Sequence, residues 1–271
     1  MILTDAKLAR LLEPFLERIL LVEPNQASAR MLSELLKGAG ARQIYVEPTG
    51  AHALNACKLL DPQVVFTEVG GPSHEGLDFV CKLRRGDLVC RQAAVIVVTA
   101  EATASTIVAA RNAGVHEFLR KPFTMRDLTR RLEAAVLHSR DWIEAVGYVG
   151  PDRRRFNSAD YQGPRKRRSD QLPASPAGRL DQTLKITRSA IAALETDPAQ
   201  ALRSLQVQAA ELKALAAALA DAKLAAAAGK LQTALSRASA GQAGPSRPAI
   251  EAAAEDLWAF VVPEPATQAV A

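Results

Sequence analysis

Cysteine, histidine and aromatic residues are scarce in this chain of 271 residues. The three cysteines, Cys57, Cys81 and Cys90, form no Cys-x-x-Cys pair, and the four histidines show no metal-ligand spacing. This excludes a disulfide scaffold and a cysteine-rich zinc site, and it favours a reducing, cytoplasmic compartment. No run approaches the roughly 18 apolar residues of a membrane span, and the first residues lack the layout of a secretory signal. The sequence therefore predicts neither a membrane span nor export.

Positive charge is in modest excess, with a formal net charge of +5. The cations of the middle of the chain gather in two runs, Arg153-Arg154-Arg155 and Arg165-Lys166-Arg167-Arg168. Dense runs in a chain of modest net charge indicate a local anion site rather than a surface that coats nucleic acid. No DNA binding is expected.

Short apolar runs alternate with segments of helical periodicity through the first half of the chain. The runs are too short for helices, and their continuous apolar character indicates burial on both faces. Such a pattern predicts an α/β fold with a five-stranded, parallel, doubly wound (flavodoxin-like) sheet. The expected strands span 18–22, 43–46, 63–67, 94–99 and 115–119, and the expected helices span 26–38, 50–60, 75–85, 103–113 and 124–138.

The rest of the chain divides by composition. Residues 1–17 predict a short amphipathic helix, and 18–140 hold the α/β domain. Residues 141–178 are rich in Gly, Pro, Ser and Arg and predict a linker. Residues 179–262 are rich in Ala, with Leu at helical spacing, and predict an all-α bundle that serves interaction, with a homodimer as one alternative. Residues 263–271 are expected to be a frayed tail.

Functional residues of open parallel sheets collect where the carboxyl ends of the strands meet the loops. In this chain those positions carry Glu23-Pro24, Thr67-Glu68, Thr99-Ala100 and Lys121-Pro122.

Residues 18–138 resemble the receiver domain of bacterial response regulators, the CheY-like fold. The resemblance rests on five strand–helix units and on motifs in the family's order: Ile19–Val22 before Glu23-Pro24, Val64–Glu68, Pro72 and Gly76, Val97–Ala100, and Lys121-Pro122-Phe123. It implies a phosphoacceptor position at Glu68 and an acidic pair at Glu23 and Pro24. It also implies switch positions at Thr99 and Phe118, and the lysine of the family at Lys121.

Two of these positions depart from the chemistry of a working receiver. Glu68 is one methylene longer than the aspartate of the family, and in-line attack on a phosphoryl group is sensitive to such an offset. Pro24 offers no ligand to a cation. We therefore expect Lys121 to neutralise Glu68 in a pseudo-receiver that is no enzyme and needs neither Mg²⁺ nor another cofactor. Whether this mimics the active or the inactive state stays open, and a receiver that still accepts phosphate is an alternative.

A loose repeat, Tyr-x-Gly-Pro-x followed by basic residues, begins at Tyr148 and again at Tyr161. It resembles the arginine-rich tails of CheY-like proteins that bind cyclic di-GMP and act at the flagellar motor. Arginine forks bind phosphate oxygens and stack on bases, so cyclic di-GMP is a candidate ligand and a solvated spacer is the alternative. The candidate nucleotide-binding residues are Tyr148, Asp152, Arg153, Arg154, Arg155, Tyr161, Arg165, Arg167 and Arg168.

These features together predict a cytoplasmic signalling protein of the two-component or phosphorelay type. It is expected to dock, independently of phosphorylation, through Thr103–Arg131, which spans the fourth helix, the fifth strand and the fifth helix of the α/β domain. The partner would be a histidine kinase, a phosphotransfer protein or the flagellar motor switch. The alternative is a cyclic di-GMP effector.

Overall fold

The computed structural model describes residues 2–69, 75–138, 140–153, 176–239 and 246–261. The chain forms two compact units. The first comprises Met1–Ile143 and Tyr148–Arg153, and the second comprises Glu144–Gly147 and Arg154–Ala271.

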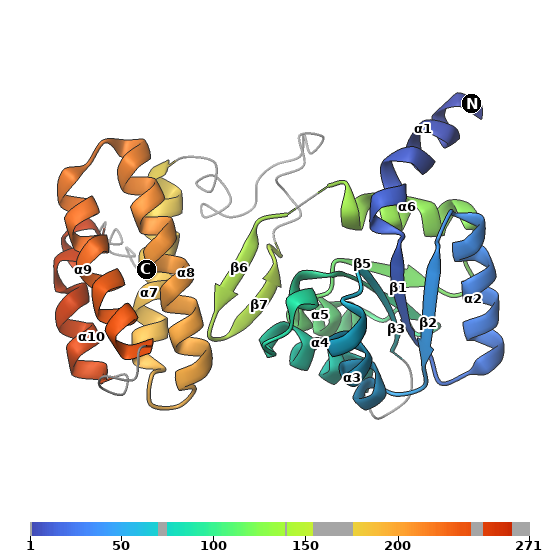
Figure 1. The fold of residues 1–271 in the computed structure, drawn as a ribbon, viewed down its shortest axis with the longest axis horizontal. Helices are drawn as coiled ribbons and strands as arrows, with labels where there is room; N and C mark the ends of the chain where they lie inside the picture. The colour runs from blue at the N-terminus through green and yellow to red at the C-terminus, as the bar shows by residue number, and fades with distance from the viewer. Residues whose placement is uncertain (1, 70–74, 139, 154–175, 240–245, 262–271) are drawn as a thin grey trace, which may run out of the picture. The chain divides into compact units, whose positions relative to one another are not determined.

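A five-stranded parallel sheet forms the centre of the first unit, with strand order β2-β1-β3-β4-β5 (Figure 1). This confirms the predicted doubly wound α/β fold, because the order is that of flavodoxin-like sheets. The strands are β1 (Arg18–Val22), β2 (Gln43–Glu47), β3 (Val64–Glu68), β4 (Ala94–Thr99) and β5 (Glu117–Arg120).

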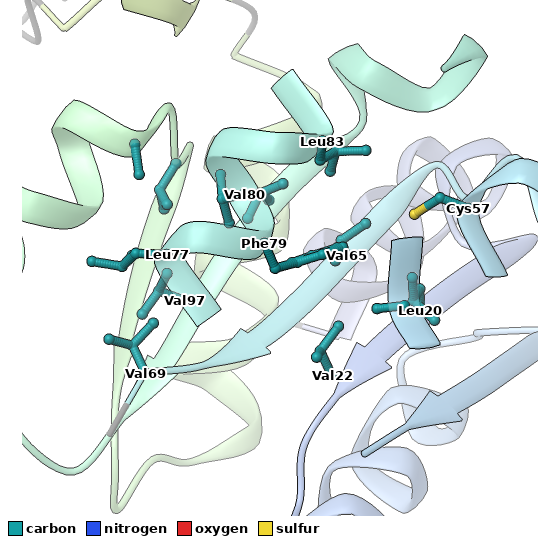
Figure 2. Packing of buried hydrophobic residues seen from close by; sticks show 14 of the residues in the cluster. Leu20, Val22, Cys57, Val65, Val69, Leu77, Phe79, Val80, Leu83 and Val97 are labelled. Carbon is teal, nitrogen blue, oxygen red and sulfur yellow. The ribbon is translucent and has the colours of Figure 1, made fainter. Parts of the chain in front are cut away.

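Helices cover both faces of this sheet, because successive strand residues point to opposite sides. Leu20 and Val65 pack on one face with α3, α4 and α5, in the cluster shown in Figure 2. Ile19 and Phe66 pack on the other face with α1, α2 and α6. The helices are α1 (Ile2–Leu12), α2 (Gln26–Gly38), α3 (Gly50–Leu60), α4 (Glu75–Arg85), α5 (Ala104–Ala113) and α6 (Met125–Val136), with 3₁₀ turns at Glu13–Phe15 and Val89–Gln92.

Side-chain caps start several of these helices near their predicted ends. Asn25 accepts a hydrogen bond from the Ser28 amide at 2.9 Å before α2. Thr103 caps α5 in the same way, and Thr124 forms a reciprocal capping box with Asp127 before α6. Such caps satisfy amides that the first turn of a helix leaves without partners.

The second unit is helical, as predicted for the Ala-rich segment. Its helices are α7 (Pro176–Ala192), α8 (Pro198–Leu219), α9 (Ala222–Ser239) and α10 (Arg247–Ala254), followed by a 3₁₀ turn at Glu255–Phe260. Leu and Ala side chains form its core. Asp197 caps α8 and Asp221 precedes α9 with a side-chain bond to the Leu224 amide. Among the described residues, no helix combines the length and the apolar character that crossing a membrane requires.

The predicted linker of residues 141–178 needs a correction. Strands β6 (Trp142–Ala145) and β7 (Tyr148–Pro151) form a two-stranded sheet inside it, and α7 already begins at Pro176. Tyr148 is buried, and its hydroxyl donates to the Pro151 carbonyl at 2.5 Å. Strands this short leave no periodic pattern in a sequence rich in Gly and Pro. Residues 154–175 and the expected tail lie outside the described residues.

Candidate functional site

The carboxyl edge of the sheet brings together the residues that the strand ends predicted. Glu68 and Thr99 are the last residues of β3 and β4, Glu23 directly follows β1, and Lys121 directly follows β5. Parallel strands end at one edge, so residues far apart in the chain meet there.

One ammonium group joins two carboxylates at this edge. Lys121 Nζ donates to Glu23 Oε2 at 2.9 Å and also to Glu68 Oε2. The other oxygen of Glu23 accepts from the Asn25 amide at 3.0 Å. We call Glu23, Glu68 and Lys121 the switch-site triad. The Lys121–Glu68 pair matches the expectation, whereas sequence reasoning missed the bond to Glu23, whose only signal was its place after the neighbouring strand.

The triad is mostly removed from solvent, with exposed side-chain fractions of 7 % for Glu23, 17 % for Glu68 and 23 % for Lys121. Burial raises the pKa of Glu68, and the negative charge of Glu23 adds to this, while the hydrogen bond from Lys121 opposes it. Burial alone would lower the pKa of Lys121, but its bonds to both carboxylates outweigh burial and raise that pKa. Lys121 is therefore charged at neutral pH.

Gly76, at the start of α4, passes unusually close to the end of β3. A Cβ atom at this position would lie 2.1 Å from the Glu68 carbonyl oxygen and 3.0 Å from Thr67 Oγ1. Only glycine allows this approach, which holds the start of α4 against the backbone that presents the Glu68 side chain.

The two predicted switch residues are both placed inward. Thr99 is buried, and its hydroxyl accepts from the Glu101 amide at 3.0 Å. Phe118 packs against the core cluster that α3, α4 and α5 form with the sheet. The Lys121-Pro122 peptide bond is cis.

The side chains at this edge offer few oxygen ligands for a magnesium ion. Magnesium in proteins takes oxygen ligands in octahedral geometry. Pro24 has no side-chain oxygen, and the Lys121 ammonium already binds an oxygen of both Glu23 and Glu68. Nowhere in the described part of the chain do three or more His, Cys, Asp or Glu residues gather so that they could hold a metal ion.

The described residues of the arginine-rich segment make their contacts within the first unit. Tyr148 is buried at 5 % exposure, and the Arg153 guanidinium carbon lies 4.2 Å from the centre of its ring. Arg153 Nη1 also donates to Asn112 Oδ1 at 2.8 Å, and the Asp152 amide donates to the Asp141 carbonyl at 2.7 Å. The Tyr148 ring therefore stacks on Arg153 and presents no open face to a nucleotide. The other candidates, Arg154, Arg155, Tyr161, Arg165, Arg167 and Arg168, lie outside the described residues.

Similarity to known proteins lies in the first half of the chain. The family model of the response regulator receiver domain matches residues 19–133. The KDP operon transcriptional regulatory protein KdpE of Escherichia coli (strain K12) is 33 % identical over 118 residues, which are 44 % of this chain and 50 % of KdpE. The transcriptional regulatory protein PdtaR of Mycobacterium tuberculosis is 30 % identical over 133 residues, which are 49 % of this chain and 63 % of PdtaR.

The chain spans about half the length of the curated relatives it matches first; for the DNA-binding response regulator MtrA of Mycolicibacterium smegmatis the share is 53 %, at 28 % identity. Among solved structures, the Vibrio cholerae chemotaxis protein CheY4 is 21 % identical with a TM-score of 0.41, over 45 % of this chain and 99 % of that one. The matched segment covers nearly all of the sheet, helices α2 to α5, most of α6 and the switch-site triad, and it leaves out α1. Residues 19–133 therefore form a response regulator receiver domain.

Proposed function

We propose that this receiver domain takes part in two-component signalling by docking to a partner without being phosphorylated. The observation that carries the proposal is the double pairing of Lys121 with Glu23 and Glu68. The switch-site triad holds the receiver domain in one fixed state and takes the place of the phosphate-dependent switch. The protein is then a docking protein, without enzymatic activity and without a required cofactor.

The triad opposes phosphoryl transfer for two physical reasons. Attack by Glu68 needs a carboxylate oxygen in line with the phosphorus atom, and the bond from Lys121 to Oε2 holds that carboxylate in one orientation, paired with the ammonium group. The developing charge on the phosphoryl group also needs a metal ion, which the donor set at this edge does not fit. Loss of either the in-line carboxylate or the metal ion slows phosphoryl transfer, and both are affected at this edge.

An apolar stretch on α5 supports docking through the predicted face Thr103–Arg131. Ile107 and Val108 are each 46 % exposed. A histidine kinase, a phosphotransfer protein or the flagellar motor switch are the candidate partners. KdpE is named a transcriptional regulator and MtrA a DNA-binding regulator. Because the match covers only about half of each, the absence of DNA binding in this chain stays a prediction.

Acetyl phosphate with Mg²⁺ tests the proposal on the full-length chain. Intact mass spectrometry should find no added phosphoryl group on the native protein. The matched control is the double variant Pro24→Asp/Glu68→Asp, which restores an acidic pair and the shorter acceptor and should become labelled. A stoichiometric, hydroxylamine-sensitive phosphoryl adduct on Glu68 of the native protein would contradict the proposal.

The cyclic di-GMP alternative depends on residues outside the described ranges, since Tyr148 and Arg153 are engaged with each other. Calorimetric titration of cyclic di-GMP into the native chain and an Arg153→Ala/Arg154→Ala variant separates it from pure docking. Saturable binding that the variant loses would favour the effector. No heat from either protein would leave docking as the function.

A further inference from the structure

Two buried cysteines of the receiver domain lie at the amino edge of the sheet, opposite to the switch-site triad. Cys57 lies in the last turn of α3, shortly before β3 begins, and Cys90 lies in the 3₁₀ turn Val89–Gln92, shortly before β4 begins. Their exposed fractions are only 3 % and 5 %. Both belong to the core cluster in which Figure 2 shows Cys57.

The side chain of Cys90 is in direct contact with Cys57. Cys90 Sγ donates to the Cys57 carbonyl oxygen at 3.6 Å, and the two thiol groups also share a hydrogen bond. Because 33 positions separate the two cysteines in the chain, only the fold brings them together. Two sulfur atoms that share a hydrogen bond reach the length of a disulfide, about 2.0 Å, by rotation of their side chains once the thiol hydrogens are lost.

The surroundings make the two thiols chemically unequal. The hydrogen bond with Cys57 lowers the pKa of Cys90, against the opposing effect of burial. The same bond and burial raise the pKa of Cys57. The nearby positive charge of Arg84 favours the thiolate form of both. Since the thiolate is the reactive form of cysteine, Cys90 is the thiol that reacts first with an oxidant.

Arg84 also fixes the position of the turn that carries Cys90. This arginine is 1 % exposed, and its Nη1 donates to the Arg91 carbonyl at 2.5 Å and to the Ala93 carbonyl at 2.9 Å. In return, Arg91 Nη2 donates to the Arg84 carbonyl at 2.8 Å. These bonds attach the turn to the end of α4 and hold the Cys90 thiol against α3.

The two thiols lie directly beneath the surface. Val89, next to Cys90, is 89 % exposed, and Leu59, two residues after Cys57, is 86 % exposed. The turn that contains Cys90 has only four residues, so its local opening exposes the thiol without unfolding of the sheet. A small oxidant such as hydrogen peroxide therefore has access to Cys90.

We propose that Cys57 and Cys90 are a peroxide-sensitive pair that closes reversibly to a disulfide. The Cys90 thiolate attacks one oxygen of hydrogen peroxide, the O–O bond breaks, and the hydroxide that leaves takes up the proton that Cys90 had released. The Cys57 sulfur then attacks the Cys90 sulfenic acid, the S–O bond breaks, and the hydroxyl group leaves with the Cys57 proton as water. The two sulfur atoms together lose two electrons, and the peroxide is reduced to two water molecules.

The disulfide would close a loop that contains β3 and α4. Such a cross-link restricts the unfolded chain and so stabilises the folded receiver domain, and a loop of this length corresponds to a rise of about 10 °C in Tm. In the reducing compartment that the sequence favours, disulfides are transient and respond to oxidants. The inference does not depend on the proposed function, because the pair lies at the other edge of the sheet from the triad.

Thiol counting by intact mass spectrometry tests the pair on the full-length chain. The folded protein is treated with hydrogen peroxide and is then unfolded in the presence of N-ethylmaleimide. All three cysteines are free in the reduced protein, so it should take up three maleimide groups. After peroxide we expect one, on Cys81, a disulfide between Cys57 and Cys90 in the peptide map, and the rise in Tm. Dithiothreitol should restore three.

Single-cysteine variants test the order of the two steps. Cys81→Ala is the matched control and should leave the disulfide and the rise in Tm unchanged. In Cys57→Ala, dimedone should trap a sulfenic acid on Cys90, whereas in Cys90→Ala it should leave Cys57 unlabelled. The inference fails if the folded native protein keeps both thiols after peroxide, if the disulfide includes Cys81, or if it forms only after unfolding in urea. Labelling of Cys57 in place of Cys90 would overturn the assigned order.

Discussion

Removing the charge of Lys121 should destabilise the receiver in a pH-dependent way. Lys121→Met keeps the apolar stem but leaves the carboxylates of Glu23 and Glu68 without a counter-charge. Breaking a fully buried pair costs about 3–5 kcal/mol. Because Glu68 and Lys121 keep 17 % and 23 % of their side-chain exposure, we discount this to about 2 kcal/mol. That loss corresponds to a fall of about 6 °C in Tm.

The pH dependence follows from the carboxyl that is left. Burial and Glu23 already raise the pKa of Glu68, and the variant loses the opposing bond from Lys121. A carboxyl whose pKa is raised by folding binds more protons in the folded than in the unfolded state. Stability therefore falls as pH rises from the unfolded pKa through the folded pKa, and it returns on acidification. The deficit of Lys121→Met should shrink between pH 7 and pH 5.

Urea unfolding followed by tryptophan fluorescence measures this free energy. Trp142 lies in the first unit and Trp258 in the second, so a Trp258→Phe background makes the signal report the receiver. Glu68→Gln alone keeps the Lys121–Glu23 pair and should change stability little. The double variant Lys121→Met/Glu68→Gln should recover part of the free energy of unfolding that Lys121→Met loses. A loss near zero at pH 7, or one equal at pH 5, would refute the electrostatic account of the triad.

Four further substitutions, one of them a control, test the local packing by urea unfolding. Gly76→Ala should cost about 3 kcal/mol, because its Cβ would meet the Glu68 carbonyl at 2.1 Å, whereas Gly147→Ala, with open space around it, should stay within about 0.5 kcal/mol. Thr124→Ala removes the capping box of α6 and should cost about 1 kcal/mol; an unchanged midpoint would exclude a contribution from the cap. Ser204→Ala should lower the stability of the helical unit, read from Trp258, by about 1 kcal/mol, and a neutral result would show that the buried bond from Ser204 to the Glu144 carbonyl adds nothing to that stability.

The sequence by itself determined the receiver fold and the position of its functional edge. Continuous apolar runs such as Ala94–Thr99 can be buried on both faces only in a sheet between helix layers. Parallel strands then end at one edge, so Glu68, Thr99 and Lys121 had to approach one another whatever the details of packing. The helix starts are also local in origin, since Asn25 and Thr124 cap the helices that directly follow them in the chain.

Only the tertiary structure decided which charged groups share a partner. Lys121 reaches Glu23 as well as Glu68, and this depends on strand order and on distances of a few tenths of an ångström that no spacing encodes. Arg84 lies in a helix whose last turn is basic, a pattern typical of a solvated surface. Arg84 is nevertheless buried, because the carbonyl groups of Arg91, Ala93 and Gly114 accept hydrogen bonds from its guanidinium group.

The β6–β7 hairpin is a second feature that only the tertiary structure decided. The pattern Tyr148-Val149-Gly150-Pro151 predicts a loop, since four residues with Gly and Pro carry no strand period. Its burial comes from contact with Gly114, more than thirty residues earlier, where two glycines let the backbones meet. Local composition determines what a segment prefers in isolation, whereas burial, ion pairing and strand pairing are set by neighbours that only the folded chain supplies.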